Sequence, residues 1–412
     1  MNATAEVAPE LREDEIAPLI AWIVAAGLRG AEPAELLETT AETLRAAGMP
    51  LLRGFLGFRT LHPLHSGYGY VWRRGGVAVD EATFRRQAEP IPSYLTSPLH
   101  YMISGGHEEL RVRLNEPGAL DFPIFAELRQ EGATGYFARA IAFREGRVLD
   151  EANHGVIFTW TTERPGGFVD PEIAVFERIL PILGLAVRSA STQHLAETVL
   201  CTYIGHDAGR RVLRGEIDRG AVRRQRAVLL FEDLRGFTAQ ADVVAPEVLV
   251  RALNGYLDAM GRPLLERGGE ILKFMGDGIL GVIGLDGDSD AGCRAALQAA
   301  RETRAAVEGL NRARRAAVEI VMEVDIVMHV GEMMYGNVGA VGRLDFTMIG
   351  PVVNEAARME PLCRALGRTV LASEAFFAAC AADGRRELVS VGRHALRDIA
   401  GERELFTLRN GD

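Results

Sequence analysis

Two aspartates of this chain have neighbours that suit metal-binding carboxylates. Asp233 follows the apolar run AVLLF at 227–231, and Asp277 lies between two glycines in the segment LKFMGDG. Apolar runs of this length predict buried strands, and a Gly-Asp-Gly turn between two of them predicts a hairpin. Such a unit can bring both carboxylates to one sheet edge, where hard oxygen ligands suit Mg²⁺ bound to a polyphosphate. The elements expected here are a strand over 227–231, a helix over roughly 246–267, and a hairpin of strands 271–274 and 279–283.

Further polar residues of the same region have a related chemical interpretation. Backbone N–H groups of Arg235-Gly236-Phe237-Thr238, near a helix start, can hold phosphate oxygens. Lys273 is a donor on an otherwise apolar strand, and Thr347 lies on a later strand. Asn354 and Arg358 share one helix face and suit a sugar and a phosphate whose charge grows during reaction. Each feature alone is more often an ordinary turn, an edge lysine or a surface pair, whereas their joint presence favours phosphoryl chemistry.

Four segments resemble the class III adenylate/guanylate cyclase family in sequence and in spacing. They are FEDLRGFT at 231–238, LKFMGDG at 272–278, the run HVG…YGNVG at 329–339, and RLDFTMIGPVVNEAAR at 343–358. The resemblance covers roughly residues 223–408. It implies an α/β (α+β) catalytic domain of the ferredoxin-like, palm type, in which helices flank a central antiparallel sheet.

The resemblance also implies a mechanism and a set of residue roles. Asp233 and Asp277, with the carbonyl of Leu234, would bind two Mg²⁺ or Mn²⁺ ions. One ion would lower the pKa of the ribose 3′-hydroxyl, and the other would hold the triphosphate as pyrophosphate leaves. The transition-state pair of the family matches Asn354, which orients the ribose, and Arg358, which contacts the α-phosphate.

The choice of purine follows from the two positions that read the base in this family, Lys273 and Thr347. A Lys ammonium can donate to adenine N1, and a Thr hydroxyl can accept from the exocyclic amine, whereas guanine presents the opposite pattern. ATP is therefore the expected substrate. Guanylate cyclase activity and a catalytically weak, nucleotide-binding signalling module are the alternatives. Pro351 departs from the family pattern, because many members have Asp there; we expect this to tune the loop before Asn354.

Family geometry implies a homodimer with shared active sites. Asp233 and Asp277 of one chain would face Lys273, Thr347, Asn354 and Arg358 of the other, so that a monomer would be inactive.

Residues 1–187 are expected to form a regulatory domain that resembles a GAF-type sensor, with a small-molecule or ion effector that the sequence does not identify. His62 and His65 have two interpretations, a metal pair or solvated imidazoles at a turn, and the turn is the commoner one. Tyr68, Tyr70 and Trp72 suit the lining of a ligand pocket, and a core or sheet-face role explains them at least as well. The elements expected in this region are helices over 34–47 and 171–187 and strands over 67–72, 136–143 and 155–161.

Residues 188–222 are expected to form a helical linker between this domain and a catalytic domain at 223–412. Steps of four and three residues are typical of a coiled-coil seam, although a chance repeat on a surface helix gives the same pattern. The seam would run through Leu195, Val199, Thr202, His206, Gly209 and Leu213. Beyond the hairpin, the pattern predicts a helix over 290–314 capped near Asp288 or Ser289, β structure over 318–330, a helix over 354–366 and a strand pair over 397–408.

Composition restricts the remaining possibilities. A net charge of −10 argues against nucleic acid as the main partner. Four scattered cysteines without CxxC spacing indicate reduced thiols. The most apolar early segment, 16–28, is shorter than the roughly 20 residues that span a bilayer. We therefore expect a soluble, cytoplasmic protein without a membrane span.

Overall fold

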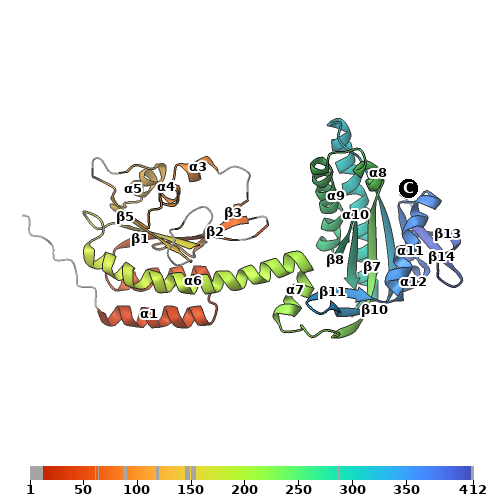
Figure 1. Ribbon diagram of the computed structural model, residues 1–412, viewed down its shortest axis with the longest axis horizontal. Coiled ribbons are helices and arrows are strands. Elements are labelled where there is room, and N and C mark those ends of the chain that lie inside the picture. Colours follow the sequence, from red (N-terminus) through yellow and green to blue (C-terminus); the bar gives the residue numbers. More distant parts are fainter. Residues whose placement is uncertain are drawn as a thin grey trace, which may run out of the picture. The chain divides into compact units, whose positions relative to one another are not determined.

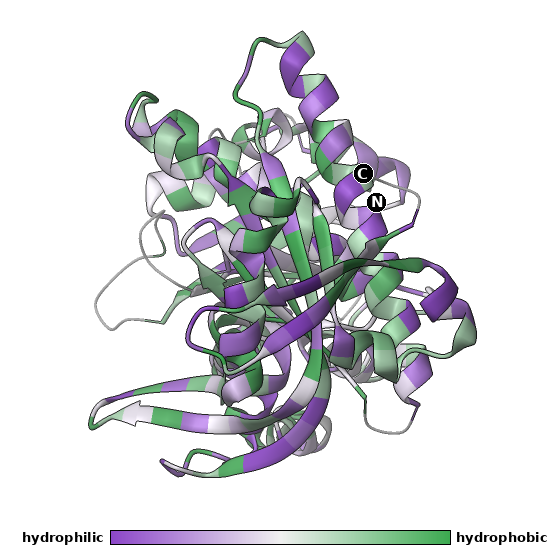
Figure 2. Ribbon diagram, turned by 90° about the vertical axis from the view of Figure 1, so that its right-hand side faces the viewer, coloured by the Kyte–Doolittle hydropathy of each residue, from purple (hydrophilic) through white to green (hydrophobic). Residues whose placement is uncertain are grey.

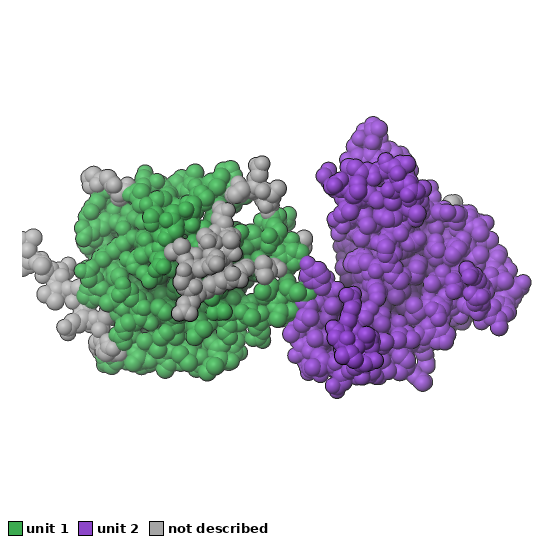
Figure 3. Space-filling model, viewed as in Figure 1, with its two compact units in different colours: residues 1–199 green, residues 200–412 purple. Residues whose placement is uncertain are grey.

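The computed structural model describes residues 13–60, 62–63, 65–86, 91–116, 120–143, 149, 155–285 and 288–409. The chain divides into two compact units, Met1–Val199 and Leu200–Asp412, which are coloured separately in Figure 3. Both units combine antiparallel strands with helices, as the sequence predicts (Figure 1).

Unit 1 is built on a six-stranded antiparallel sheet in the order β3-β2-β1-β6-β5-β4. Helices α1, α2 and α6 lie on one face of the sheet, and α3 to α5 lie on the other (Figure 1). The strands are β1 (Leu51–Arg59), β2 (His65–Arg73), β3 (Asp80–Arg85), β4 (Glu109–Arg113), β5 (Gly135–Ala142) and β6 (Gly155–Thr162). The helices are α1 (Glu13–Leu28), α2 (Pro33–Ala46), α3 (Pro92–Leu95), α4 (Pro98–Gly105), α5 (Pro123–Gln130) and α6 (Asp170–Ile204).

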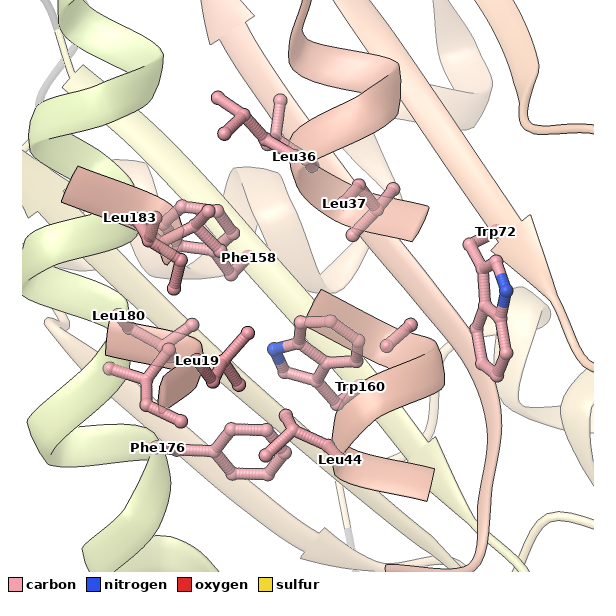
Figure 4. Packing of buried hydrophobic residues seen from close by; sticks show 14 of the residues in the cluster. Leu19, Leu36, Leu37, Leu44, Trp72, Phe158, Trp160, Phe176, Leu180 and Leu183 are labelled. Carbon is pink, nitrogen blue, oxygen red and sulfur yellow. The ribbon is translucent and has the colours of Figure 1, made fainter. Parts of the chain in front are cut away.

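The larger core of unit 1 lies between the sheet and α1, α2 and α6 (Figure 4). Trp160 and Phe176 are fully buried and stack with ring centroids 5.5 Å apart. Tyr70 and Trp72 belong to this core, and Trp72 Nε1 donates to Glu42 Oε1 at 3.2 Å. The structure therefore supports the core interpretation of these aromatic residues. All five elements predicted in this region are present, and α6 extends well beyond its predicted end at 187.

Unit 2 contains the ferredoxin-like βαββαβ arrangement. Strands β7 (Val222–Arg235), β8 (Glu270–Met275), β9 (Gly278–Gly284) and β10 (Glu323–Ala340) pair antiparallel in the order β10-β7-β9-β8. Helices α9 (Pro246–Glu266) and α10 (Ser289–Ala316) are the two crossovers and cover one face of the sheet. Asp288 caps α10 by accepting from the backbone N–H of Asp290 at 2.9 Å. The central strands are largely hydrophobic, and the helices alternate hydrophilic and hydrophobic residues (Figure 2).

The remaining elements extend the sheet and cover its other face. Strand β12 (Val370–Ser373) runs parallel to β10, and β11 (Arg343–Ile349) pairs with the distal half of β10. Helix α11 (Pro351–Leu366) packs on the face opposite α9 and α10. The other elements are α8 (Phe237–Ala241), α12 (Glu374–Ala379), α13 (Ala382–Arg386), β13 (Leu388–Ala395) and β14 (Glu402–Leu408).

The predicted coiled-coil seam over 188–222 is wrong as a continuous helix. Helix α6 ends at Ile204, Gly205 adopts φ +95°, and a separate helix, α7 (His206–Leu213), follows. Gly209 packs so closely on the end of α6 that a Cβ there would lie 2.8 Å from the Cys201 nitrogen. Half of the predicted seam positions therefore lie on α7, and β7 already begins at Val222. A left-handed glycine inside the repeat ends the helix regardless of the pattern around it.

Three other predictions need correction in their bounds. The closing strand pair consists of 388–395 and 402–408, so its first strand precedes the predicted start at 397. Helix α11 begins at Pro351 and not at Asn354, because proline fits the first turn of a helix, where no N–H is needed. The β structure predicted over 318–330 begins at Glu323 and continues to Ala340.

No helix within the described ranges combines the length and the apolar character needed to cross a membrane. All four cysteines lie in described segments, and none forms a disulfide bond.

Candidate active site

Asp233 and Asp277 are brought together at one end of the central strands. Glu232 pairs with Ile279, which places Asp233 opposite Gly278, the residue after Asp277. The hairpin turns over Gly276-Asp277, with Gly276 at φ +67°. A Cβ on Gly278 would lie 2.7 Å from Asp233 Oδ1, so the carboxylate can lie against the hairpin only because residue 278 is glycine.

The electrostatics of this pair favour a bound cation. Burial, and then the charge of Asp277, raise the pKa of Asp233 to about 7. Burial also raises the pKa of Asp277. Two partly buried carboxylates disfavour joint ionisation, and a divalent cation between them would reverse that effect.

The oxygen ligands available at Asp233 and Asp277 fit a Mg²⁺ or Mn²⁺ ion that the protein holds jointly with a substrate. In the described parts of the chain, no group of three or more His, Cys, Asp or Glu side chains is arranged to hold a metal ion. A cation at Asp233 and Asp277 would therefore take further oxygen ligands from the Leu234 carbonyl and from a phosphate. Magnesium is commonly bound by one or two carboxylates plus substrate phosphates.

An ion pair that the sequence did not indicate holds the strand end beside Asp233. Asp325 of β10 lies directly across from Asp233 and is 2% exposed. Arg235 Nε donates to Asp325 Oδ2 at 2.8 Å, and its Nη2 donates to the Arg368 carbonyl at 2.8 Å. This network fixes the end of β7 on β10 and so fixes the backbone that carries Asp233 and Leu234.

The predicted phosphate loop follows directly. Gly236 adopts the left-handed conformation, with φ +84°, and precedes the short helix α8, which begins with Phe237 and Thr238. The first turn of a helix leaves its N–H groups without intrahelical acceptors. These groups are thus placed next to the carboxylates, where phosphate oxygens bound to a cation would lie.

The two predicted purine-reading residues lie on β8 and β11. The exposed ammonium of Lys273 forms an ion pair with Asp345, which lies two residues before Thr347 on β11. Residues two apart on a strand point to the same face. Asp345 was not singled out from the sequence, because its partner lies 72 residues away.

Asn354 and Arg358 lie exposed on α11. Val352 packs on Gly331 and the Cys363 thiol lies near the Ile326 carbonyl, so the helix runs back along β10. Glu360 and Arg364 lie farther along α11, and their charges affect the pKa of Asp233. At 1.5 Å per residue, Asn354 lies roughly 14 Å along the axis from Cys363, which is near the level of Asp233. Within one chain, the structure therefore places Asn354 away from the carboxylates.

His62 and His65, for which a metal pair is one of the two interpretations from sequence, have ring centroids 4.3 Å apart. They belong to no described group of three or more potential ligands. Burial and the neighbouring His65 lower the pKa of His62.

A buried glutamate next to the site gives a prediction on stability. Glu232 faces the α9–α10 side, is fully buried, and has an Oε2 atom without a hydrogen-bond partner, while Thr303 Oγ1 donates to Oε1 at 3.5 Å. Burial raises the pKa of Glu232 to about 8 from an ordinary value of 4.5. The alternation of inward positions 228, 230 and 232 on β7 was the signal that could have found it.

Because the folded-state pKa is the higher one, ionisation of Glu232 opposes folding. The stability that protonated Glu232 contributes is complete below pH 4.5 and is lost as the pH rises toward 8. When the pH is raised from 6 to 8, the free energy of unfolding of Glu232→Gln should therefore increase by roughly 2 kcal/mol relative to that of wild type. Urea unfolding at both pH values in EDTA measures this difference. Parallel pH dependence of the two proteins would contradict the assignment.

Comparisons with known proteins find relatives of the part of the chain that carries this site. Residues 221–407 match the family described as adenylate and guanylate cyclase catalytic domain. An adenylate cyclase of Anabaena cylindrica is 35% identical over 162 residues, which are 38% of this chain and 31% of that protein. Adenylate cyclase 1 of Rhizobium meliloti (strain 1021) is 32% identical over 170 residues, 40% of this chain and 25% of that protein. The matched segments are therefore a third or less of either relative.

Among solved structures, the adenylyl cyclase CyaB from P. aeruginosa is 24% identical, with a TM-score of 0.42, and the match covers 47% of this chain and 97% of that one. The family match and the sequence relatives show that the carboxy-terminal part of the chain is a class III cyclase catalytic domain.

Proposed function

We propose that the protein is an adenylate cyclase, which converts ATP to 3′,5′-cyclic AMP and pyrophosphate. The observation that carries this proposal is the placement of Asp233 against the Asp277 hairpin, at the end of β7, in a domain that matches the cyclase family. The substrate is inferred from Lys273 and Thr347, whose donor and acceptor groups complement adenine and not guanine.

The chain's own groups have distinct tasks in this reaction. Asp233, Asp277 and the Leu234 carbonyl would hold two Mg²⁺ or Mn²⁺ ions. When bound, these ions supply acidity at the ribose 3′-hydroxyl and offset the charge of the triphosphate. The N–H groups of Gly236, Phe237 and Thr238 bind phosphate oxygens.

The transition-state groups come from α11. The amide of Asn354 orients the ribose, so that its 3′-oxygen lies in line with the α-phosphorus. The guanidinium of Arg358 stabilises the charge that grows on the α-phosphate. Its present partner, Asp398, lies 3.7 Å away and both side chains are exposed, so the pair is weak enough to exchange for a phosphate.

We propose that two copies of the chain form each active site. The separation of Asn354 from Asp233 along α11 supports this arrangement, because a single copy does not bring the Asn354 amide to the carboxylates. We also propose that unit 1 regulates catalysis through α6, which belongs to unit 1 for most of its length and ends in unit 2.

The test is product identification with purified full-length protein and Mn²⁺. Mass spectrometry should show cyclic AMP and pyrophosphate in equal amounts, with cyclic GMP formed far more slowly from GTP. Faster cyclic GMP formation would establish the guanylate cyclase alternative. Nucleotide binding without any product would establish the binding module instead.

The Lys273–Asp345 ion pair predicts a residue that tunes base recognition. Asp345→Asn removes the partner that orients the ammonium, so KM for ATP should rise about two- to five-fold, the range expected for an exposed ion pair, while kcat changes little. Asp383→Asn, which breaks an exposed pair with Arg386 on α13, is the matched control. Steady-state kinetics on both variants measure the effect. An unchanged KM in Asp345→Asn would show that the pair plays no part in binding.

A further inference from the structure

We propose that unit 1 binds a small oxyanion, a carboxylate or a phosphate, at Arg53 of β1 on the sheet face covered by α5. This site deepens the regulatory role proposed for unit 1 by giving the chemical class of its ligand. Its test is a binding measurement that needs no catalysis, so its failure and the failure of the cyclase proposal are separable.

A row of polar side chains that includes Arg53 crosses the sheet from β2 to β5. Arg53 pairs directly with Arg73 on β2 and with Thr161 on β6, and Thr161 pairs with Tyr136 on β5. Directly paired residues point to the same face of a sheet. Tyr136 packs in the cluster formed by α4 and α5, which identifies the face.

Arg53 lacks a partner for its charge in the described parts of the chain. It forms no hydrogen bond or ion pair there, and its Nε is shielded from solvent without an acceptor. Burial, followed by the charge of Arg73, lowers the pKa of Arg53. Glu127 of α5 and Glu131, the residue after α5, act in the opposite direction only through longer-range attraction. Arginine stays protonated in proteins, so Arg53 keeps its positive charge.

Thr161 adds a second unsatisfied group beside Arg53. Its side chain is 1% exposed, and its Oγ1 has no hydrogen-bond partner. Buried polar groups are nearly always paired, and an unpaired buried charge is costly. The buried Thr161 hydroxyl and the half-buried Arg53 guanidinium lie directly opposite each other, and together they indicate a ligand that satisfies both.

The chemistry of the row selects the ligand. Two guanidinium groups face each other across β1 and β2, and Arg73 is already paired with Asp80. A cation would be repelled, and a neutral molecule would leave the charge uncompensated. A carboxylate or phosphate matches the planar fork of Arg53 and accepts from the Thr161 hydroxyl.

The experiment is a thermal-shift and calorimetric titration of the full-length protein. The probes are sodium acetate, sodium succinate and sodium phosphate, each compared with sodium chloride at equal ionic strength. At least one probe should raise the Tm of wild type by 2 °C or more. The carboxylate and phosphate arms distinguish the two sources of the oxyanion.

Variants make the assignment specific. Arg53→Gln should abolish the shift and raise Kd at least ten-fold, while its Tm without anion equals or exceeds that of wild type, because an unpaired charge is removed. Thr161→Val should weaken binding several-fold. Arg139→Gln is the control, because Arg139 lies on the same sheet and is paired with Glu109 at 3.1 Å.

Three results would overturn the proposal. They are no Tm shift with any of the probes, an equal shift in wild type and Arg53→Gln, or an Arg53→Gln protein that is markedly less stable without anion, which would reveal a partner within the protein.

Discussion

Replacing Asp277 by asparagine should lower the rate of cyclic nucleotide formation by about a thousand-fold or more. The variant keeps the shape of the side chain but removes one of the two carboxylates that would hold the catalytic cations, whose stabilisation of phosphoryl transfer amounts to several kcal/mol. Initial rates with Mn²⁺·ATP, measured by chromatography of the product, give the effect.

The same variant has a second expected property that separates a lost metal site from a damaged fold. The charge of Asp277 contributes to the raised pKa of Asp233, so its removal should lower that pKa and leave the metal-free protein at least as stable at pH 8. Asp383→Asn should match wild type in both assays. Activity of Asp277→Asn within ten-fold of wild type would remove the carboxylate pair from the mechanism.

Mixing two inactive variants should restore activity if each active site is shared between chains. Asp277→Asn lacks a metal ligand, and Arg358→Ala lacks the group proposed for the α-phosphate, so each homodimer should be at least about a hundred-fold impaired. In a mixed dimer, one site keeps Asp277 from one chain and Arg358 from the other. With random pairing, half of the dimers are mixed and one of their two sites works, which predicts about a quarter of wild-type activity.

The control for this experiment is a mixture of Asp233→Asn and Asp277→Asn chains. Both changes fall on the same side of each shared site, so no combination of these chains yields a site with both aspartates. Mixed dimers must be shown directly, for example by native mass spectrometry with one labelled chain. If they form and no activity returns, the two residue sets act within one chain.

The catalytic unit could be predicted well from sequence because its signals are local. The apolar run before Asp233 and the turn at Asp277 each report their own secondary structure, which predicts a strand–helix–hairpin unit. The family resemblance then implies the ferredoxin-like arrangement around it. The bounds were poorer where a single residue decides them. Gly205 ends α6 inside an apparent repeat, and Pro351 starts α11 three residues before the predicted position.

The partners of the site residues could not be read from one sequence. Arg235 and Asp325 are 90 residues apart, and Lys273 and Asp345 are 72 apart. Such pairs depend on strand register, which one sequence does not specify across long connections. Arg53 illustrates the same limit, because only the pairing of β1 with β6 shows that it faces Thr161.

The most direct test of the shared two-cation site is the crystal structure of the full chain with a non-hydrolysable ATP analogue and Mn²⁺, with anomalous diffraction at the manganese edge. We predict two manganese peaks between Asp233 and Asp277 of one chain, with the adenine held by Lys273 and Thr347 of the second chain. Manganese bound elsewhere, or a nucleotide whose base and phosphates contact a single chain, would contradict this account.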